Sequence, residues 1–168
     1  MVARDADTGY IVGVMWLQRL GPTRIAFIPY YAIDRIVQGH GVGQLLFTYA
    51  RELLAQSGEV DLLLWEVEAP EGDEHHPTQR RLHFYEKCGG QVVRFAKCFC
   101  APPIDNSAEP MPLWLMVAPV GSYEIVNDLA HALEWAEALL TYDVDYCHYP
   151  EHRSAVLRRM RQQEYELH

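Results

Sequence analysis

The segment with the clearest chemical meaning is a glycine-rich run at residues 38–43, directly before a predicted helix at residues 44–56. The first backbone N–H groups of a helix have no partner within it, and the helix dipole adds partial positive charge there. Gly39, Gly41 and Gly43 allow close approach to the backbone and tolerate the positive φ angles of anion-binding loops. The run therefore predicts a phosphate site.

Two well-known phosphate loops do not match this run. The dinucleotide fingerprint requires a glycine where Gln44 stands, and a P-loop requires Gly-Lys-Ser/Thr, which is absent. The run instead has the form Gln-x-x-Gly-x-Gly, from Gln38 to Gly43. A glycine-rich turn without a ligand is the structural alternative.

The elements that must position this loop alternate between strand and helix. Strand-like runs are expected at residues 2–4, 10–20, 24–35, 60–67, 91–100 and 112–119. Helical spacing is expected at 44–56, from Pro77 to the Gly89-Gly90 pair, and from Ser122 onward with a break at 142–150. This order predicts an α/β layer structure with a mixed sheet.

The tail from Ser122 carries an apolar stripe at spacings of three and four. Its members are Ile125, Leu129, Leu133, Ala136 and Leu140. Because such a stripe must be covered, we expect the tail helices to pack on the sheet or on a second subunit, either covering the core alone or also walling a substrate pocket.

Two motifs together resemble the GNAT superfamily of N-acetyltransferases. The run at 38–43 resembles that family's acetyl-CoA pyrophosphate loop, and residues 84–90, beginning Phe84-Tyr85, resemble its Phe-Tyr-x-x-x-Gly-Phe helix end. Residues 2–13 resemble its central hairpin. The sequence departs from the family at Gly90, where a Phe is usual, at Thr78, where Asn is common, and at Arg35, where Pro is common.

The resemblance implies an α/β (α+β) fold, with a mixed, mostly antiparallel central sheet flanked by helices and an extra C-terminal helical tail. Residues 1–119 would form an acetyl-CoA-binding core that lacks the usual first strand and first two helices. Residues 120–168 would form a helical extension packed on the core or on a partner subunit. Either the native N-terminus lies upstream of Met1, or the extension replaces the missing helices.

The resemblance also implies transfer of the acetyl group of acetyl-CoA to an amine by direct attack in a ternary complex. The alternative is a catalytically weak acyl-CoA-binding module that regulates or joins a partner. The residues implied in acetyl-CoA binding are Ile33, Ile36, Val37, Gln38, Gly39, His40, Gly41, Val42, Gly43 and Gln44. The backbone of residues 33–37 would hold pantetheine, and residues 38–43 the pyrophosphate.

Three residues are the main candidates for proton transfer in such a reaction, and a fourth is a lesser one. Tyr85 matches the family's general acid, and its alternative role is packing between helix and sheet. Glu66 and Glu68 lie two apart in a predicted strand and so share a face. One of them could accept the ammonium proton, or both could only attract the cation. Asp34 is a lesser candidate.

Composition limits the classes of molecule that the protein is expected to bind. The formal net charge of −9 disfavours nucleic acid and suits a small-molecule or peptide amine. The sequence shows no signal peptide or apolar run of spanning length, so we expect a cytoplasmic protein without membrane contact. The sequence leaves the oligomeric state open, and a homodimer is one alternative.

Histidine and cysteine spacing predicts no metal site. The histidine pairs are His75-His76 and His148 with His152, neither with companion ligands at zinc spacing. Cys98 and Cys100 share a predicted strand face but have no CxxC partner pair, so buried reduced thiols are expected.

Overall fold

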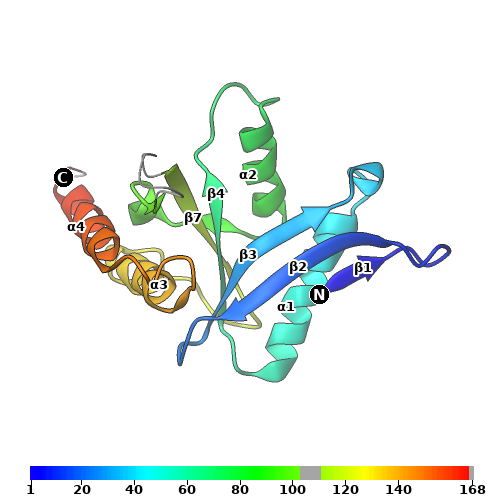
Figure 1. Cartoon of the computed structure of the whole chain (residues 1–168), viewed down its shortest axis with the longest axis horizontal. Helices are drawn as coiled ribbons and strands as arrows, with labels where there is room; N and C mark the ends of the chain where they lie inside the picture. Colours follow the sequence, from blue (N-terminus) through cyan, green and yellow to red (C-terminus); the bar gives the residue numbers. More distant parts are fainter. Residues whose placement is uncertain (103–110, 167–168) are drawn as a thin grey trace.

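The computed structural model describes residues 1–102 and 111–166, and it contains one sheet with helices on both faces (Figure 1). Residues 103–110 and 167–168, which belong to the expected core and extension, lie outside the described residues. The strands are β1 (Val2–Arg4), β2 (Ile11–Arg19), β3 (Ile25–Ile33), β4 (Leu62–Glu68), β5 (Gln91–Val92), β6 (Cys100–Ala101) and β7 (Met111–Pro119). The helices are α1 (Val42–Ser57), α2 (Pro77–Lys87), α3 (Leu129–Tyr142) and α4 (Pro150–Glu166).

The sheet is mixed, as the order of elements predicts, and mostly antiparallel, as the resemblance implies. Its order is β1-β2-β3-β4-β7-β5, with β6 paired to β7. Within the described residues only β3 and β4 pair in parallel, and their register runs from Ile25–Leu62 to Phe27–Leu64. Beyond these pairs the two strands separate, which Figure 1 shows as they diverge from a shared beginning.

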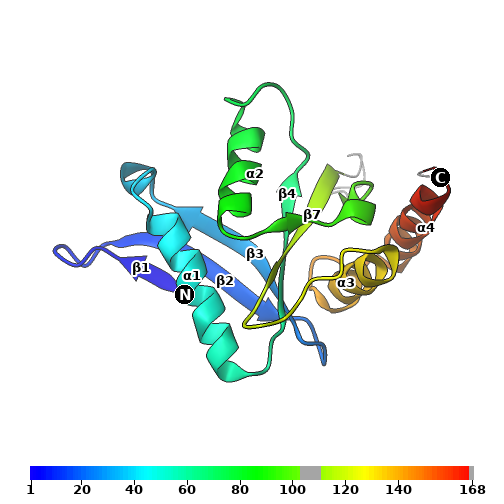
Figure 2. The ribbon, with the colours of Figure 1, turned by 180° about the vertical axis from the view of Figure 1, so that it is seen from behind.

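Alternation along β4 divides the core into two layers. Leu63, Trp65 and Val67 pack with α1 and α2, whereas Leu62 and Leu64 pack with α3 and α4. Successive side chains of a strand point to opposite faces, so one apolar strand supplies both layers. Figure 2 shows α1 and α2 over the rear face of the sheet.

The predicted strand at residues 91–100 is confirmed at its two ends but is interrupted between them. Only Gln91–Val92 and Cys100–Ala101 pair with β7, and a 3₁₀ turn at Arg94–Ala96 separates them. The side chain of Asn127 fixes this turn, because it accepts from the Arg94 N–H at 3.0 Å and donates to the Val92 carbonyl at 2.8 Å. Cys98 and Cys100 therefore do not share a strand face.

The tail forms two helices separated by residues 143–149, which confirms the predicted break. The first helix begins later than expected, at Leu129, where the Asp128 side chain accepts from the His131 N–H at 2.9 Å. Ile125 precedes the helix but still packs against its core layer. Among the helices of residues 1–102 and 111–166, none is long and apolar enough to cross a membrane.

Candidate active site

The glycine run forms the uncapped start of α1. Gly39 and Gly41 both have a φ of 81°, in the left-handed region where glycine has no steric penalty. Gly41 is the N-cap residue and supplies no side-chain hydrogen bond, and the first helical bond runs from the Leu45 N–H to the Gly41 carbonyl at 3.0 Å. The N–H groups at positions 42–44 therefore precede the helical hydrogen bonds, as an anion site requires.

Gly43 lies where the start of α1 packs against the rings of Tyr31 and Phe84, which form an aromatic wall. The Tyr31 hydroxyl donates to the Gly43 carbonyl at 2.6 Å, and a Cβ at Gly43 would lie 3.1 Å from Phe84 and from the Tyr31 hydroxyl. A side chain here would thus displace a ring. The site requires glycine because of its packing, in contrast to Gly41, where backbone angle is decisive.

A cleft of about 700 Å³ opens at this point between the end of β3, the start of α1 and the inner side of α2. Its lining includes Ile33, Gln38, Gly39 and Gly43 on one side, and Arg80, Arg81 and Tyr85 on the other. Backbone donors and two guanidinium groups therefore border the same space as an aromatic wall. That combination suits a ligand with an anionic part and a long apolar or amide part.

The remaining predicted loop residues are placed unevenly around the cleft. The Gln38 side chain donates to the Ile33 carbonyl at 2.9 Å, which ties the loop to the end of β3. His40 contacts the Gln38 carbonyl through Nδ1 at 3.1 Å. Ile36 is 84% exposed and points away from the core. Val37 is half-buried, Val42 starts α1, and Gln44 is exposed on its first turn.

Asp34 has a structural partner that the sequence did not suggest. Its Oδ1 accepts from the Ile36 N–H at 2.8 Å and caps the 3₁₀ turn at Arg35–Val37. A carboxylate that caps the turn leading into the glycine run positions the loop backbone. The lesser assignment of Asp34 as a base stays a prediction.

One edge of β4 is open beside the cleft. On its other edge β4 pairs with β7 through Glu68, but among the described strands none pairs with it on the β3 side beyond Leu64. Backbone groups along this open edge can hydrogen-bond an extended amide chain, as in strand addition.

Tyr85 on α2 lies at the cleft wall and is 8% exposed. Its ring packs 5.2 Å from Trp65 and 6.4 Å from Tyr31, between centroids. Burial raises the pKa of Tyr85 to about 12, which the charge of Arg81 partly opposes. The phenol therefore remains a proton donor at neutral pH, while its ring belongs to the core layer.

Glu66 is half-buried on the other face of β4 and accepts a hydrogen bond from the hydroxyl of Tyr146. Burial raises the pKa of Glu66 to about 7; the Tyr146 hydrogen bond lowers it, and the nearby Asp143 and Asp145 raise it. A carboxylate with such a pKa can accept a proton near neutral pH. Sequence reasoning missed Tyr146, because it lies 80 residues away in a segment that reads only as a helix break.

Glu68 has a different partner from Glu66. It is exposed and forms an ion pair with Arg81 of α2. Strand alternation gives the two carboxylates the same face, as predicted, but they engage separate elements and do not form one acidic pair. Glu68 instead links the end of β4 to the helix that carries Tyr85.

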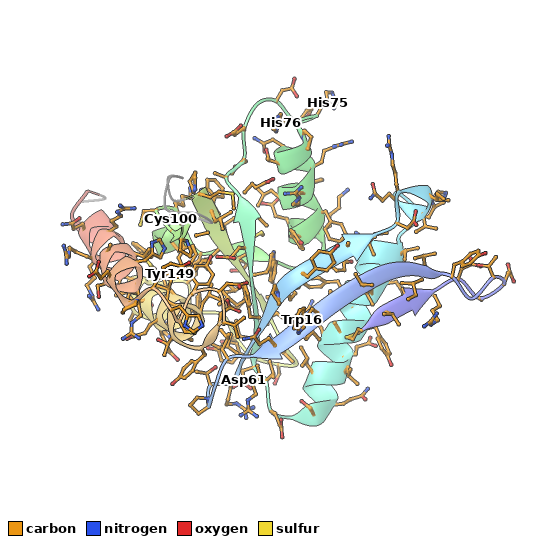
Figure 3. The ribbon with its side chains drawn as sticks, viewed as in Figure 1. Trp16, Asp61, His75, His76, Cys100 and Tyr149 are labelled. Atoms are coloured by element: carbon orange, nitrogen blue, oxygen red, sulfur yellow. The ribbon has the colours of Figure 1, made fainter. Side chains whose placement is uncertain are left out.

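Two of the histidines singled out in the sequence, His76 and His152, serve local structure. His76 caps α2 by accepting from the Thr78 N–H, at the top of the helix in Figure 3, and His152 contacts the Cys100 carbonyl at 2.8 Å. Within residues 1–102 and 111–166, no group of three or more His, Cys, Asp or Glu side chains could hold a metal ion.

Comparison with known proteins gives a consistent family and fold. The sequence model of the acetyltransferase (GNAT) family matches residues 1–90, just over half of the chain. No curated protein sequence matches.

Solved structures share the fold. A protein assigned to the GNAT acetyltransferases from Bacteroides thetaiotaomicron superposes with a TM-score of 0.63 at 18% identity, covering 87% of this chain and 71% of that one. The ribosomal-protein-S18-alanine N-acetyltransferase from Escherichia coli gives 0.51 at 18% identity, covering 72% and 71%. A chimera of spermidine N-acetyltransferase SpeG from Vibrio cholerae with hSSAT gives 0.51 at 18%, covering 70% and 66%.

Proposed function

Because the chain belongs to the acetyltransferase (GNAT) family, we propose that it transfers the acetyl group of acetyl-CoA to an amine by direct attack in a ternary complex. One observation carries this proposal: the uncapped glycine turn, two arginines and Tyr85 border one cleft beside the open edge of β4. The acceptor class is a small-molecule or peptide amine, which the acidic net charge of −9 favours.

The residues present fit acetyl-CoA. The N–H groups at positions 42–44 and the side chains of Arg80 and Arg81 would bind its phosphates. The backbone of residues 33–37 and the open edge of β4 would hold the pantetheine amides. Gly43 lets Phe84 and Tyr31 pack beside the start of α1, since a Cβ there would meet both at 3.1 Å.

Two side chains would move the protons. As the amine nitrogen bonds to the acetyl carbon and the carbon–sulfur bond breaks, Glu66 takes a proton from nitrogen, directly or through water. Tyr85 gives its phenolic proton to the departing sulfur. Tyr85 and Glu66 lie on opposite faces of β4, and β3 and β4 separate beside them, so the acyl donor and the acceptor would approach from different sides.

Glu68 was the second candidate base. Its ion pair with Arg81 favours a role in holding α2 against β4, so we assign the base to Glu66.

A turnover assay with acetyl-CoA and candidate amines tests the proposal. The purified chain is incubated with acetyl-CoA and a panel of polyamines, amino acids and peptides, and release of free thiol is followed. We expect acetyl-CoA-dependent thiol release with at least one amine. Acetyl-CoA binding by calorimetry without turnover on any acceptor would favour the alternative, a catalytically weak acyl-CoA-binding module.

A further inference from the structure

Tyr146, in the connection between α3 and α4, is a buried residue whose phenol contacts Glu66. Tyr146 is 4% exposed, its ring packs 5.8 Å from that of Phe99, and its hydroxyl donates to Glu66 Oε1. A phenylalanine would fill the same apolar surroundings without carrying a polar atom into them. The hydroxyl is therefore accounted for by the carboxylate and not by packing.

Only one oxygen of Glu66 is held in this way. Among the side chains that the structure describes, those of residues 1–102 and 111–162, none forms a hydrogen bond with the second oxygen, Oε2, and the Glu66 side chain keeps partial exposure to solvent. A carboxylate fixed through one oxygen has a defined orientation, while its other oxygen can accept a proton. This is the arrangement that a positioned general base requires.

We infer that Tyr146 is a positioning residue for acetyl transfer: it fixes Glu66 through Oε1 and leaves Oε2 to receive the proton of the acceptor amine. The inference rests on the proposed function. In the reaction the nitrogen–carbon bond forms, the carbon–sulfur bond breaks, the nitrogen proton passes to Oε2, and Tyr85 protonates the sulfur. Tyr146 keeps its own proton throughout. The connection between α3 and α4 is thereby required for catalysis as well as for burial.

The groups that act on Glu66 come mainly from the same connection. Besides Tyr146, these are Asp143, which is 1% exposed, and the exposed Asp145; the β7 residue opposite Glu66 is the apolar Leu115. The hydroxyl favours the charged carboxylate and lowers its pKa, whereas the two aspartates and burial raise it. On the far side, Cys100 acts on Tyr146 and is itself contacted by Arg159 of α4.

Because these effects oppose one another, two substitutions should shift the pKa of Glu66 in opposite directions. Tyr146→Phe removes the hydrogen bond and should raise the pKa of Glu66. Because the active base is deprotonated, the acid limb of the kcat/KM profile should move to higher pH by about one unit, with activity recovered at alkaline pH. Asp143→Asn removes a negative charge and should move the limb to lower pH, while its retained Oδ1 can still accept from the Asp145 N–H.

Tyr149→Phe is the matched control, since Tyr149 lies on the same connection (Figure 3) but is 43% exposed. The pKa of Glu66 is measured separately by ¹³C carboxyl NMR titration in the full chain without substrate. Parallel movement of the NMR pKa and the acid limb supports the inference. An NMR pKa unchanged by Tyr146→Phe overturns it, whatever the activity. An NMR pKa that moves while the acid limb stays fixed instead overturns Glu66 as the base in the proposed function.

Discussion

Tyr85 packs in the core and also lines the cleft, and removing its hydroxyl oxygen separates the two roles. Its ring lies in the aromatic layer beside Trp65 and Phe47, and the residue also lines the cleft. We expect Tyr85→Phe to lower kcat by about 10²–10⁴-fold, because a positioned acid contributes that much. Acetyl-CoA affinity, measured by calorimetry, should stay nearly unchanged.

Tyr49→Phe provides the control, since Tyr49 is 57% exposed on α1 and removal of its hydroxyl should leave kcat unaltered. Full activity in Tyr85→Phe would reduce Tyr85 to a core aromatic residue.

Glu66 should also make the free energy of unfolding depend on pH, whether or not a substrate is present. Its pKa rises from 4.5 to about 7 on folding, so the folded state holds a proton that the unfolded state has lost between these pH values. The free energy of unfolding should therefore fall as pH rises from about 4.5 to 7, by at most about 3 kcal/mol. Glu66→Gln should remove this slope in urea denaturation series at several pH values.

The glutamine can still accept from Tyr146, so the comparison isolates the charge. Identical slopes in the two proteins would mean that the Glu66 carboxyl is solvated as in the unfolded chain.

At the scale of elements, the proposed acetyl-CoA site depends on the start of α1. Gly41 has a φ of 81°, and a Cβ there would meet nothing within 4 Å. Gly41→Ala should therefore cost about 1–2 kcal/mol of stability from backbone strain. It should also weaken acetyl-CoA binding by about tenfold or more, because a shifted backbone loses hydrogen bonds to an anion.

Gly9 in the β1–β2 turn is a matched control, with a φ of 73° and equally open space. Gly9→Ala should show similar strain in denaturation experiments and unchanged affinity in calorimetry. Equal affinities in the two variants would place the phosphates elsewhere.

For the whole molecule, the C-terminal helices share the core layer of the sheet. Leu139 and Trp135 of α3 and Met160 of α4 are each at most 2% exposed and pack with Leu64 and Leu115. Leu139→Ala should cost about 2–5 kcal/mol, the usual range for a buried cavity, within a single urea transition.

Leu53→Ala on α1, where Leu53 is 44% exposed, should change stability by less than about 1 kcal/mol. Two separate transitions, or a small effect of Leu139→Ala, would show that residues 120–168 fold apart from the sheet.

These helices cover only part of their face of the sheet. Trp16 and Tyr30 are direct partners on β2 and β3, and they remain 64% and 57% exposed. Figure 3 shows Trp16 on the front of β2, away from α3 and α4. The extension therefore packs over β4, β7 and the first part of β3, where Ile25 and Phe27 lie, and leaves this outer part of the sheet face exposed.

Local patterns in the sequence determined the glycine turn, the helices around Tyr85 and in the tail, and most strands. Backbone freedom at Gly39 and Gly41 and the periodicity of apolar residues depend on neighbours in the chain, so they can be read without coordinates. The 3₁₀ turn that interrupts the predicted strand at residues 94–96 could not be predicted from the sequence, because the side chain that fixes it, Asn127, lies 33 residues away along the chain.

Which of the two carboxylates has a raised pKa was decided only by tertiary structure. Glu66 and Glu68 are alike in sequence, but burial and the hydroxyl of Tyr146 act on the first, while Arg81 pairs with the second. A pKa depends on burial and on the charges nearby in space. For Glu66 those charges come from a connection 80 residues along the chain, a distance that no local pattern can span.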